Sequence, residues 1–209
     1  MDIDAYFGYL NNKLDNTETG TLEEYAKRNR IPIINKAGLN FLKLIIMLTR
    51  SVKILEVGAA IGYSAISMAL VNEEINITTF EKNGKMYDKA VENIEKFRLR
   101  ERINIINKDA LEVNINCIDK GYDLMFIDAA KSQYRRLFEV FSPCVRKKGV
   151  IVSDNIKFHD LVSEEEILNK NTRQLVKKIK LYNEWLKNNE LYDTIFFNIG
   201  DGISVSIKK

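Results

Sequence analysis

The segment that decides the fold is residues 54–64, which read ILEVGAAIGYS. An apolar run from Val52 to Val57 predicts a short buried strand, and a helical pattern begins at Tyr63. Between them lie two alanines and two glycines, Gly58 and Gly62. Small residues in a turn from strand to helix let backbone amides approach a ligand closely. The segment therefore predicts the first strand, turn and helix of an α/β fold, with a ligand at the turn.

Strands and helices alternate beyond this unit. Further strands are expected at residues 75–80, 103–106, 122–127 and 149–153, and helices at about 84–97, 131–141 and 172–188. Two alternating segments, 194–199 and 203–207, flank Gly200-Asp201-Gly202 and predict an antiparallel hairpin. The fold class expected is α/β, with a mostly parallel sheet, helices on both faces and one reversed strand.

A helical extension is expected over residues 1–50, ahead of a core at 51–209. Without repeats or a linker rich in Pro and Gly, the chain is expected to form one domain, 1–209. Two apolar stripes in the extension have helical spacing and are interpreted as core or subunit contacts: Ile3, Tyr6, Phe7, Leu10 and Leu14, then Ala37, Phe41, Leu44, Ile45 and Leu48. Because two stripes exceed what one sheet needs to be covered, a homodimer is expected.

The composition excludes several classes of protein. The 209 residues are 45% hydrophobic, which permits a buried core and excludes a disordered tail. No apolar run of about 18 residues occurs, and the N-terminus is acidic, so we expect a cytoplasmic protein. Two cysteines and one histidine, His159, argue against zinc chemistry, which leaves carboxylates, amides, lysines and backbone groups. The net charge of +3 permits a nucleic-acid partner without requiring one.

Acidic residues after the next two strands suggest a nucleoside cofactor. Glu81 follows Gly62 by 19 residues and is expected to accept the ribose hydroxyls, while Asp109-Ala110 is expected to frame an adenine edge. The alternative is a tight turn with surface acids. The motifs G-x-G-x-x-G and Gly-Lys-Ser/Thr are absent, which argues against NAD and nucleoside triphosphates. Glu56 is unfavourable beside a pyrophosphate and favours a cofactor with a cationic amino-acid end.

A second group of polar residues ends the fourth and fifth strands. Asp128 follows the fourth, and Asp154-Asn155 follows the fifth. If these strands are neighbours, the three side chains converge and offer the oxygen ligands that suit Mg²⁺. Lys131 would then lie close enough to remove a proton from a substrate hydroxyl. The alternatives are that the acidic residues only cap loops and helices and that Lys131 is a surface lysine.

Together these features resemble the class I S-adenosylmethionine-dependent methyltransferases. Their first motif, E-x-G-x-x-x-G, is similar to residues 56–62, and their Rossmann-like sheet ends in a reversed hairpin. The chain also resembles the metal-dependent catechol and caffeoyl-coenzyme A O-methyltransferases, and the similarity covers nearly its whole length. The segments that carry this resemblance are residues 56–64, 128–131 and 154–155. Residues 127–134 (IDAAKSQY) and 31–34 (IPII) are most similar to the bacterial tRNA 5-hydroxyuridine methyltransferases within that family.

The resemblance implies roles for individual residues. Asp128, Asp154 and Asn155 would hold Mg²⁺ or another divalent cation, and Lys131 would be the catalytic base, with Asp128 beside it. S-adenosylmethionine would contact Ile34, Glu56, Gly58, Gly62, Tyr63, Ser64, Glu81, Asp109, Ala110 and Asp128. The chain departs from its relatives at residues 157–160 (KFHD), where they commonly have a loop that contains glycine.

The resemblance also implies the reaction. The enzyme would methylate the 5-hydroxyl of 5-hydroxyuridine at the tRNA wobble position and give 5-methoxyuridine. The alternatives are a small catechol or hydroxycinnamoyl substrate and a non-catalytic module that binds the cofactor or RNA. Arg135, Arg136, Lys157 and Arg173 are candidates for tRNA contacts, or they belong to ordinary solvated helix faces. Tyr63, Tyr134 and Phe158 are candidates for stacking on an extruded base, with core packing expected for at least one of them.

Overall fold

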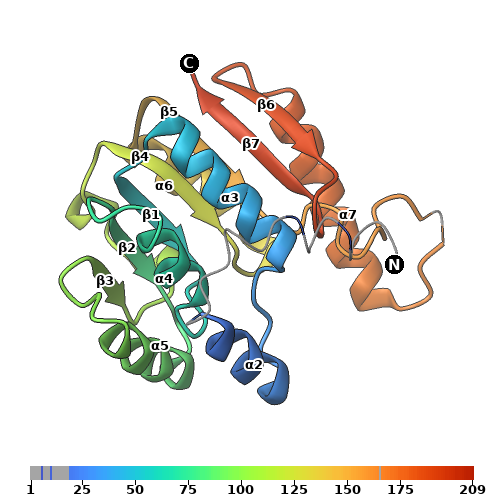
Figure 1. The fold of residues 1–209 in the computed structure, drawn as a ribbon. Helices are drawn as coiled ribbons and strands as arrows, with labels where there is room; N and C mark the ends of the chain where they lie inside the picture. The colour runs from blue at the N-terminus through green and yellow to red at the C-terminus, as the bar shows by residue number, and fades with distance from the viewer. Residues whose placement is uncertain (1–5, 7–9, 11–18, 165) are drawn as a thin grey trace.

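The computed structural model describes residues 6, 10, 19–164 and 166–209, which form a seven-stranded sheet with helices on both faces (Figure 1). The strand order is β3-β2-β1-β4-β5-β7-β6. The strands are β1 (Lys53–Val57), β2 (Asn76–Phe80), β3 (Ile103–Ile106), β4 (Tyr122–Ile127), β5 (Val145–Ser153), β6 (Tyr192–Phe197) and β7 (Ile203–Lys208). The pairs within β1 to β5 are parallel, and β7 runs antiparallel to both β5 and β6. The predicted sheet with one reversed strand is confirmed.

The helices that pack on the sheet begin at local sequence features. They are α2 (Gly20–Asn29), α3 (Lys36–Thr49), α4 (Tyr63–Ala69), α5 (Gly84–Lys96), α6 (Tyr134–Phe141) and α7 (Lys170–Lys187). Asn35, Asn83 and Asn169 precede α3, α5 and α7, and each side chain accepts a backbone N–H from the first turn. Such caps satisfy donors that the helix leaves free, so asparagine fixes where these three helices start.

Alternating side chains divide the core into two clusters. Ile54 of β1 packs with α3, α4 and α5 on one face, while Leu55 and Val57 pack with α6 and α7 on the other. Leu22 and Ala26 of α2 join the first cluster. The period of two along a strand therefore accounts for both helical layers.

Several strand boundaries differ from the prediction, most by one or two residues and the start of β5 by four. β5 begins at Val145 rather than at residue 149, because Arg146, Lys147 and Lys148 extend the strand without apolar side chains. Lys148 has a φ of 61°, and the pairing with β4 changes register in this region. β6 begins at Tyr192, whose ring packs 4.9 Å from that of Phe138. Neither strand starts with a simple apolar run, so the periodicity of the sequence did not predict where β5 and β6 begin.

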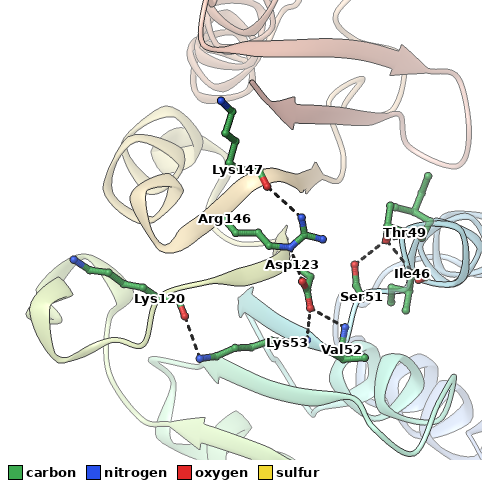
Figure 2. A network of polar contacts seen from close by, with 10 residues as sticks. Ile46, Thr49, Ser51, Val52, Lys53, Lys120, Asp123, Arg146 and Lys147 are labelled. Carbon is green, nitrogen blue, oxygen red and sulfur yellow. Dashed lines mark hydrogen bonds and ion pairs between the residues drawn. The ribbon is translucent and has the colours of Figure 1, made fainter.

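A polar network holds the strands together at the end of the sheet where β1, β4 and β5 begin (Figure 2). Asp123 accepts the backbone N–H groups of Val52 and Lys53 at 2.9 and 2.8 Å and the Arg146 Nε–H at 2.6 Å. Burial acts to raise the pKa of Asp123, but these hydrogen bonds and the Arg146 charge outweigh it and lower the pKa. The network therefore contributes to the stability of the fold.

The apolar stripe at residues 37–48 is only partly core. Helix α3 buries Leu39, Leu42 and Ile46, whereas Leu44 and Leu48 from the predicted stripe are exposed. Ala37 is exposed as well, and Phe41 and Ile45 are only partly buried. The core interpretation is therefore wrong for Ala37, Leu44 and Leu48. In the first stripe only Tyr6 and Leu10 are described, and both are exposed; Ile3, Phe7 and Leu14 lie outside the described residues.

In the described part of the chain, no helix is long and apolar enough to cross a membrane.

Candidate active site

A cavity of about 850 Å³ opens where β1, β2, β4 and β5 end. Its volume is in the range of small-molecule binding sites. The segments that line it are residues 29–34, 57–60, 63–64, 80–83, 108–111, 128–131 and 158–159, with single contributions from elsewhere that include Asn155 and Asp201. The predicted turn therefore shares one cavity with Asp128 and Asn155, whereas Asp154 is buried and does not line it.

The glycine turn contributes to one wall of the cavity. The backbone conformation and close packing of this turn require residues without a side chain at positions 58 and 62. Gly58 has a φ of 104°, and a Cβ there would lie 2.0 Å from the backbone oxygen of Asp128. Gly62 has a φ of 82° and lies against Ala90 of α5, where a Cβ would be 3.4 Å from the alanine side chain. Gly58 lines the cavity, whereas Gly62 lies behind it and allows α5 to pack closely.

Glu81 lines the cavity and also shapes the turn. Its Oε2 accepts the N–H of Ala60 and its Oε1 accepts the N–H of Asn83, both at 2.8 Å. Each carboxylate oxygen can accept a second hydrogen bond, so the side chain is still able to bind hydroxyl groups. The other predicted cofactor residues that line the same cavity are Ile34, Tyr63, Ser64, Asp109, Ala110 and Asp128.

Glu56 lies behind the turn and does not line the cavity. It is fully buried, and its Oε2 accepts a hydrogen bond from the Thr79 hydroxyl, whereas its Oε1 has no partner. Burial raises the pKa of Glu56 to about 7, although the Ser64 and Thr79 hydroxyls act to lower it. An electrostatic influence of Glu56 on a ligand would therefore act through the turn rather than by direct contact.

The acidic residues after β4 and β5 lie side by side. Ile127 and Ser153 are register partners, so Asp128 and Asp154 follow paired positions. Asp154 is fully buried; its Oδ1 accepts the N–H of Asn155 at 2.8 Å, and its Oδ2 has no hydrogen-bond partner among the described residues. Burial, and then the charge of Asp128, raises the pKa of Asp154 to about 7. The predicted adjacency of the two strands is confirmed.

These residues fit a divalent cation. A buried carboxylate oxygen without a hydrogen bond is costly, and a cation beside Asp154 would compensate it. The Tyr134 hydroxyl is also buried and unpartnered; burial, followed by the charges of Asp128 and Asp154, raises its pKa well above 10. Among the described residues, no group of three or more His, Cys, Asp and Glu side chains could hold a metal ion. The set that fits a divalent cation includes an amide: it consists of Asp128, Asp154 and the side-chain oxygen of Asn155.

Lys131 lies on the same wall, in the 3-10 turn Lys131–Gln133 that precedes α6. Its Nζ is 3.1 Å from Asp128 Oδ1 and 5.9 Å from the centre of the Tyr134 ring. The side chain therefore reaches the acidic group from the side of the cavity.

A family model described as "O-methyltransferase" matches residues 8–209. The chain belongs to this O-methyltransferase family. It is 27% identical over 200 residues to a caffeoyl-CoA O-methyltransferase of Populus kitakamiensis, covering 92% of this chain and 85% of the relative. It is 29% identical over 179 residues to a catechol O-methyltransferase of Niastella koreensis, covering 81% and 79% of the two chains.

Solved structures agree with this assignment. A Staphylococcus aureus protein provisionally described as a caffeoyl-CoA O-methyltransferase superposes with a TM-score of 0.94 at 36% identity, covering 100% of both chains. The Podospora anserina methyltransferase PaMTH1, solved with bound SAH, superposes with a TM-score of 0.86 at 19% identity, covering 99% of this chain and 95% of that one. The second match establishes only a shared fold.

None of the four predicted tRNA-contacting residues lines the cavity of this O-methyltransferase. Arg135 donates to Glu139 at 2.9 Å and lies 5.2 Å from the Trp185 ring. Lys157 pairs with Asp160 at 2.9 Å, and Arg136 and Arg173 are exposed. The prediction that Tyr134 stacks on a base is wrong, because its ring is buried 5.5 Å from that of Tyr182.

The sequence analysis missed several residues in the wall of this O-methyltransferase cavity. Lys82 and Lys108 each adjoin a predicted acidic residue in the chain, which is a signal that could have identified them. Arg30 ends α2 with a φ of 52°, and no sequence feature marked it. Asp201 was interpreted only as part of a hairpin turn, although it also lines the cavity.

Proposed function

We propose that this O-methyltransferase uses S-adenosylmethionine and a divalent cation, Mg²⁺ in the first instance, to methylate a hydroxyl that has a second oxygen beside it. The observation that carries the proposal is the shared cavity. The Gly58 turn with Glu81 supports a nucleoside cofactor at one end, and Asp128, Asn155 and Lys131 support an acceptor with two oxygens at the other. The buried Asp154 follows a strand position paired with the one before Asp128.

Each part of the chain has a defined task in this proposal. Glu81 accepts the ribose hydroxyls, and the small residues of the turn admit the amino-acid end of the cofactor. Asp128, Asp154 and the Asn155 amide hold the cation, which lowers the pKa of the acceptor hydroxyl when it is bound. Lys131 removes the proton from that hydroxyl, and Asp128 holds the resulting ammonium in place.

Methyl transfer from a sulfonium is an in-line displacement, so alignment of the two reactants contributes much of the rate. The cavity walls supply that alignment. Because the turn follows β1 and Asp128 follows the adjacent β4, their separation is fixed by the sheet. The backbone N–H of Asp128 donates to the oxygen of Val57 at 3.0 Å and couples the two halves directly.

For the acceptor we propose 5-hydroxyuridine at the tRNA wobble position, which would be converted to 5-methoxyuridine. Its 5-hydroxyl and 4-carbonyl supply the required pair of oxygens. Four basic side chains line the cavity (Arg30, Lys82, Lys108 and Lys131), and α7 exposes further ones, including Lys170, Arg173 and Lys177. Such groups support contact with an RNA backbone.

A catechol or hydroxycinnamoyl ester is the second candidate acceptor. The Populus and Niastella relatives act, by their names, on caffeoyl-CoA and catechol. The positions of Arg135 and Lys157, each paired with a carboxylate, also favour this alternative, because these side chains are already engaged.

The two acceptors are separated by one assay. The protein is incubated with S-adenosylmethionine labelled in the methyl group, together with either tRNA that lacks 5-methoxyuridine or a panel of catechols. Labelled 5-methoxyuridine in the digested tRNA supports the first candidate. Label in catechols alone excludes it.

Removal of the cation tests the rest of the proposal. Excess chelator is expected to abolish turnover and leave SAH binding measurable by calorimetry, and Asp154→Ala is expected to do the same. Full turnover in chelator would contradict the role of the cation. Full activity of the Asp154→Ala variant would instead favour a non-catalytic role for the acidic group.

A further inference from the structure

Asp201 connects the C-terminal hairpin to the candidate cation site. It lies between β6 and β7, lines the cavity and is only 12% exposed at its side chain. The backbone of this turn also holds the loop after β5: the N–H of Ile156 donates to the oxygen of Gly202 at 3.1 Å, and that of Lys157 to the oxygen of Asp201 at 3.0 Å. The hairpin turn is therefore docked on the segment that carries Asn155.

Close docking explains the glycine after Asp201. Gly202 has a φ of 83°, and a Cβ there would lie 2.4 Å from Lys157 Cγ and 3.0 Å from the Lys157 nitrogen. A larger residue would push the turn away from the loop. Gly202 thus serves the contact between two segments as well as the hairpin itself.

The side chain of Asp201 makes contacts of its own. Its Oδ2 accepts a hydrogen bond from Asn155 Nδ2 at 3.2 Å. Its Oδ1 accepts the backbone N–H of His159 and lies 3.8 Å from His159 Nδ1. An ionised carboxylate only accepts hydrogen bonds, so it fixes which end of the Asn155 amide faces it. The NH₂ group turns toward Asp201, and the amide oxygen stays available.

The amide orientation matters because only its oxygen is a ligand for a hard cation. We propose that Asp201 is a positioning residue that holds the Asn155 amide with its oxygen free for the divalent cation. The inference rests on the proposed function, in which Asn155 is the third protein ligand. Asp201 acts through Asn155 and requires no contact with the cation.

The first measurement is Mn²⁺ binding to the full chain, followed by electron paramagnetic resonance without cofactor or acceptor. Loss of an outer partner of a metal ligand typically costs 10–100-fold in affinity, and we expect a loss of about that size for Asp201→Asn. The matched control is Asp160→Asn. Asp160 lies in the same loop and pairs with Lys157, but it is not bonded to Asn155, so we expect a change of less than about twofold.

A second background separates amide orientation from loss of charge. In Asn155→Asp the residue at 155 has no NH₂ group to donate, so Asp201→Asn would supply the missing donor from the other side. We therefore expect Asp201→Asn to weaken Mn²⁺ binding in the wild-type background and not in the Asn155→Asp background. Simple loss of a carboxylate would weaken binding similarly in both backgrounds.

The outcomes are distinct. Unchanged Mn²⁺ affinity in Asp201→Asn, or equal losses in both backgrounds, would overturn the inference while the proposed function stands. A wild-type chain that binds SAH but no Mn²⁺ would overturn both the cation in the proposed function and this inference. If Asp201→Asn alone does not fold, as judged by its thermal transition, the comparison is made between Asn155→Asp and the double variant. Weaker Mn²⁺ binding by the double variant than by Asn155→Asp would overturn the inference.

Discussion

The Lys131 Nζ lies 3.1 Å from Asp128 Oδ1 on the wall of the cavity. A general base must lie within hydrogen-bond reach of the proton that it removes, so the position of its side chain matters. The contact with Asp128 holds Lys131 beside the proposed cation site. Asp128 is therefore shared between Lys131 and that site.

Replacement of Lys131 tests this arrangement. Lys131→Met keeps much of the side-chain volume and removes the amine, so we expect turnover to fall by about 10²–10⁴-fold, the range for general bases. The affinity for SAH should change by less than about twofold, because transition-state chemistry and not cofactor binding is removed. The control is Lys96→Met at an exposed position on α5. Wild-type turnover in Lys131→Met would contradict its role as the base.

Glu81 is expected to control cofactor affinity. In Glu81→Gln the side chain loses its charge and one of its two acceptor ends, which disturbs the hydrogen bonds to Ala60 and Asn83. Hydrogen bonds to charged groups contribute about 1.5–3 kcal/mol, so SAH should bind about 10–100-fold more weakly in calorimetry. Glu95→Gln, at an exposed position on α5, is the control. Equal SAH affinity in both variants would exclude the ribose contact.

The glycine turn provides a prediction about stability. Gly58→Ala forces a Cβ to within 2.0 Å of the Asp128 backbone oxygen at a φ of 104°. We expect a loss of at least about 2 kcal/mol in the free energy of unfolding, measured by denaturant titration. Gly84→Ala is the matched control, because no atom lies within 4 Å of its added Cβ and alanine favours a helix. Similar stability of the two variants would show that the turn can relax.

Glu56 predicts a dependence of stability on pH. Its pKa is about 7 in the folded chain, against 4.5 as the reference value. Between these values the folded chain retains a proton that the unfolded chain has lost, so this stabilisation is complete below pH 4.5 and falls as the pH rises through 7. Glu56→Gln cannot ionise. Its stability relative to the wild type should rise from pH 5 to pH 8 by about 3 kcal/mol or less. A constant difference across that range would show that the pKa of Glu56 is the same in the folded and the unfolded chain.

The homodimer remains a prediction. Among the described residues, Leu44, Met47 and Leu48 leave an apolar strip of α3 exposed. Burial of such a strip against a second copy would remove apolar area from water. Light scattering after size exclusion at micromolar concentration is expected to give twice the chain mass, and a single chain mass would contradict the prediction.

The sequence predicted the elements that are apolar and periodic. β3 and β4 begin and end at the predicted residues, because most of their side chains are apolar and buried. The charged start of β5 was missed for the opposite reason, since residues 146–148 are exposed. Within the candidate site, the sequence predicted only those contacts that follow from the pairing of neighbouring strands. Asp128 and Asp154 followed from strand order, whereas the contact from Asp201 to Asn155 depends on how a hairpin docks, and no local pattern encodes that.

The docking of the hairpin also orders events during synthesis. Asn155 and Asp201 are 46 positions apart, so the loop after β5 leaves the ribosome well before the aspartate that bonds to it. A nascent chain can thus form most of the parallel sheet and the glycine turn while the acidic corner is still unsupported. The contact between Asp201 and Asn155 can form only after the hairpin has been synthesised, so the proposed support of the Asn155 amide comes later than the sheet that carries it.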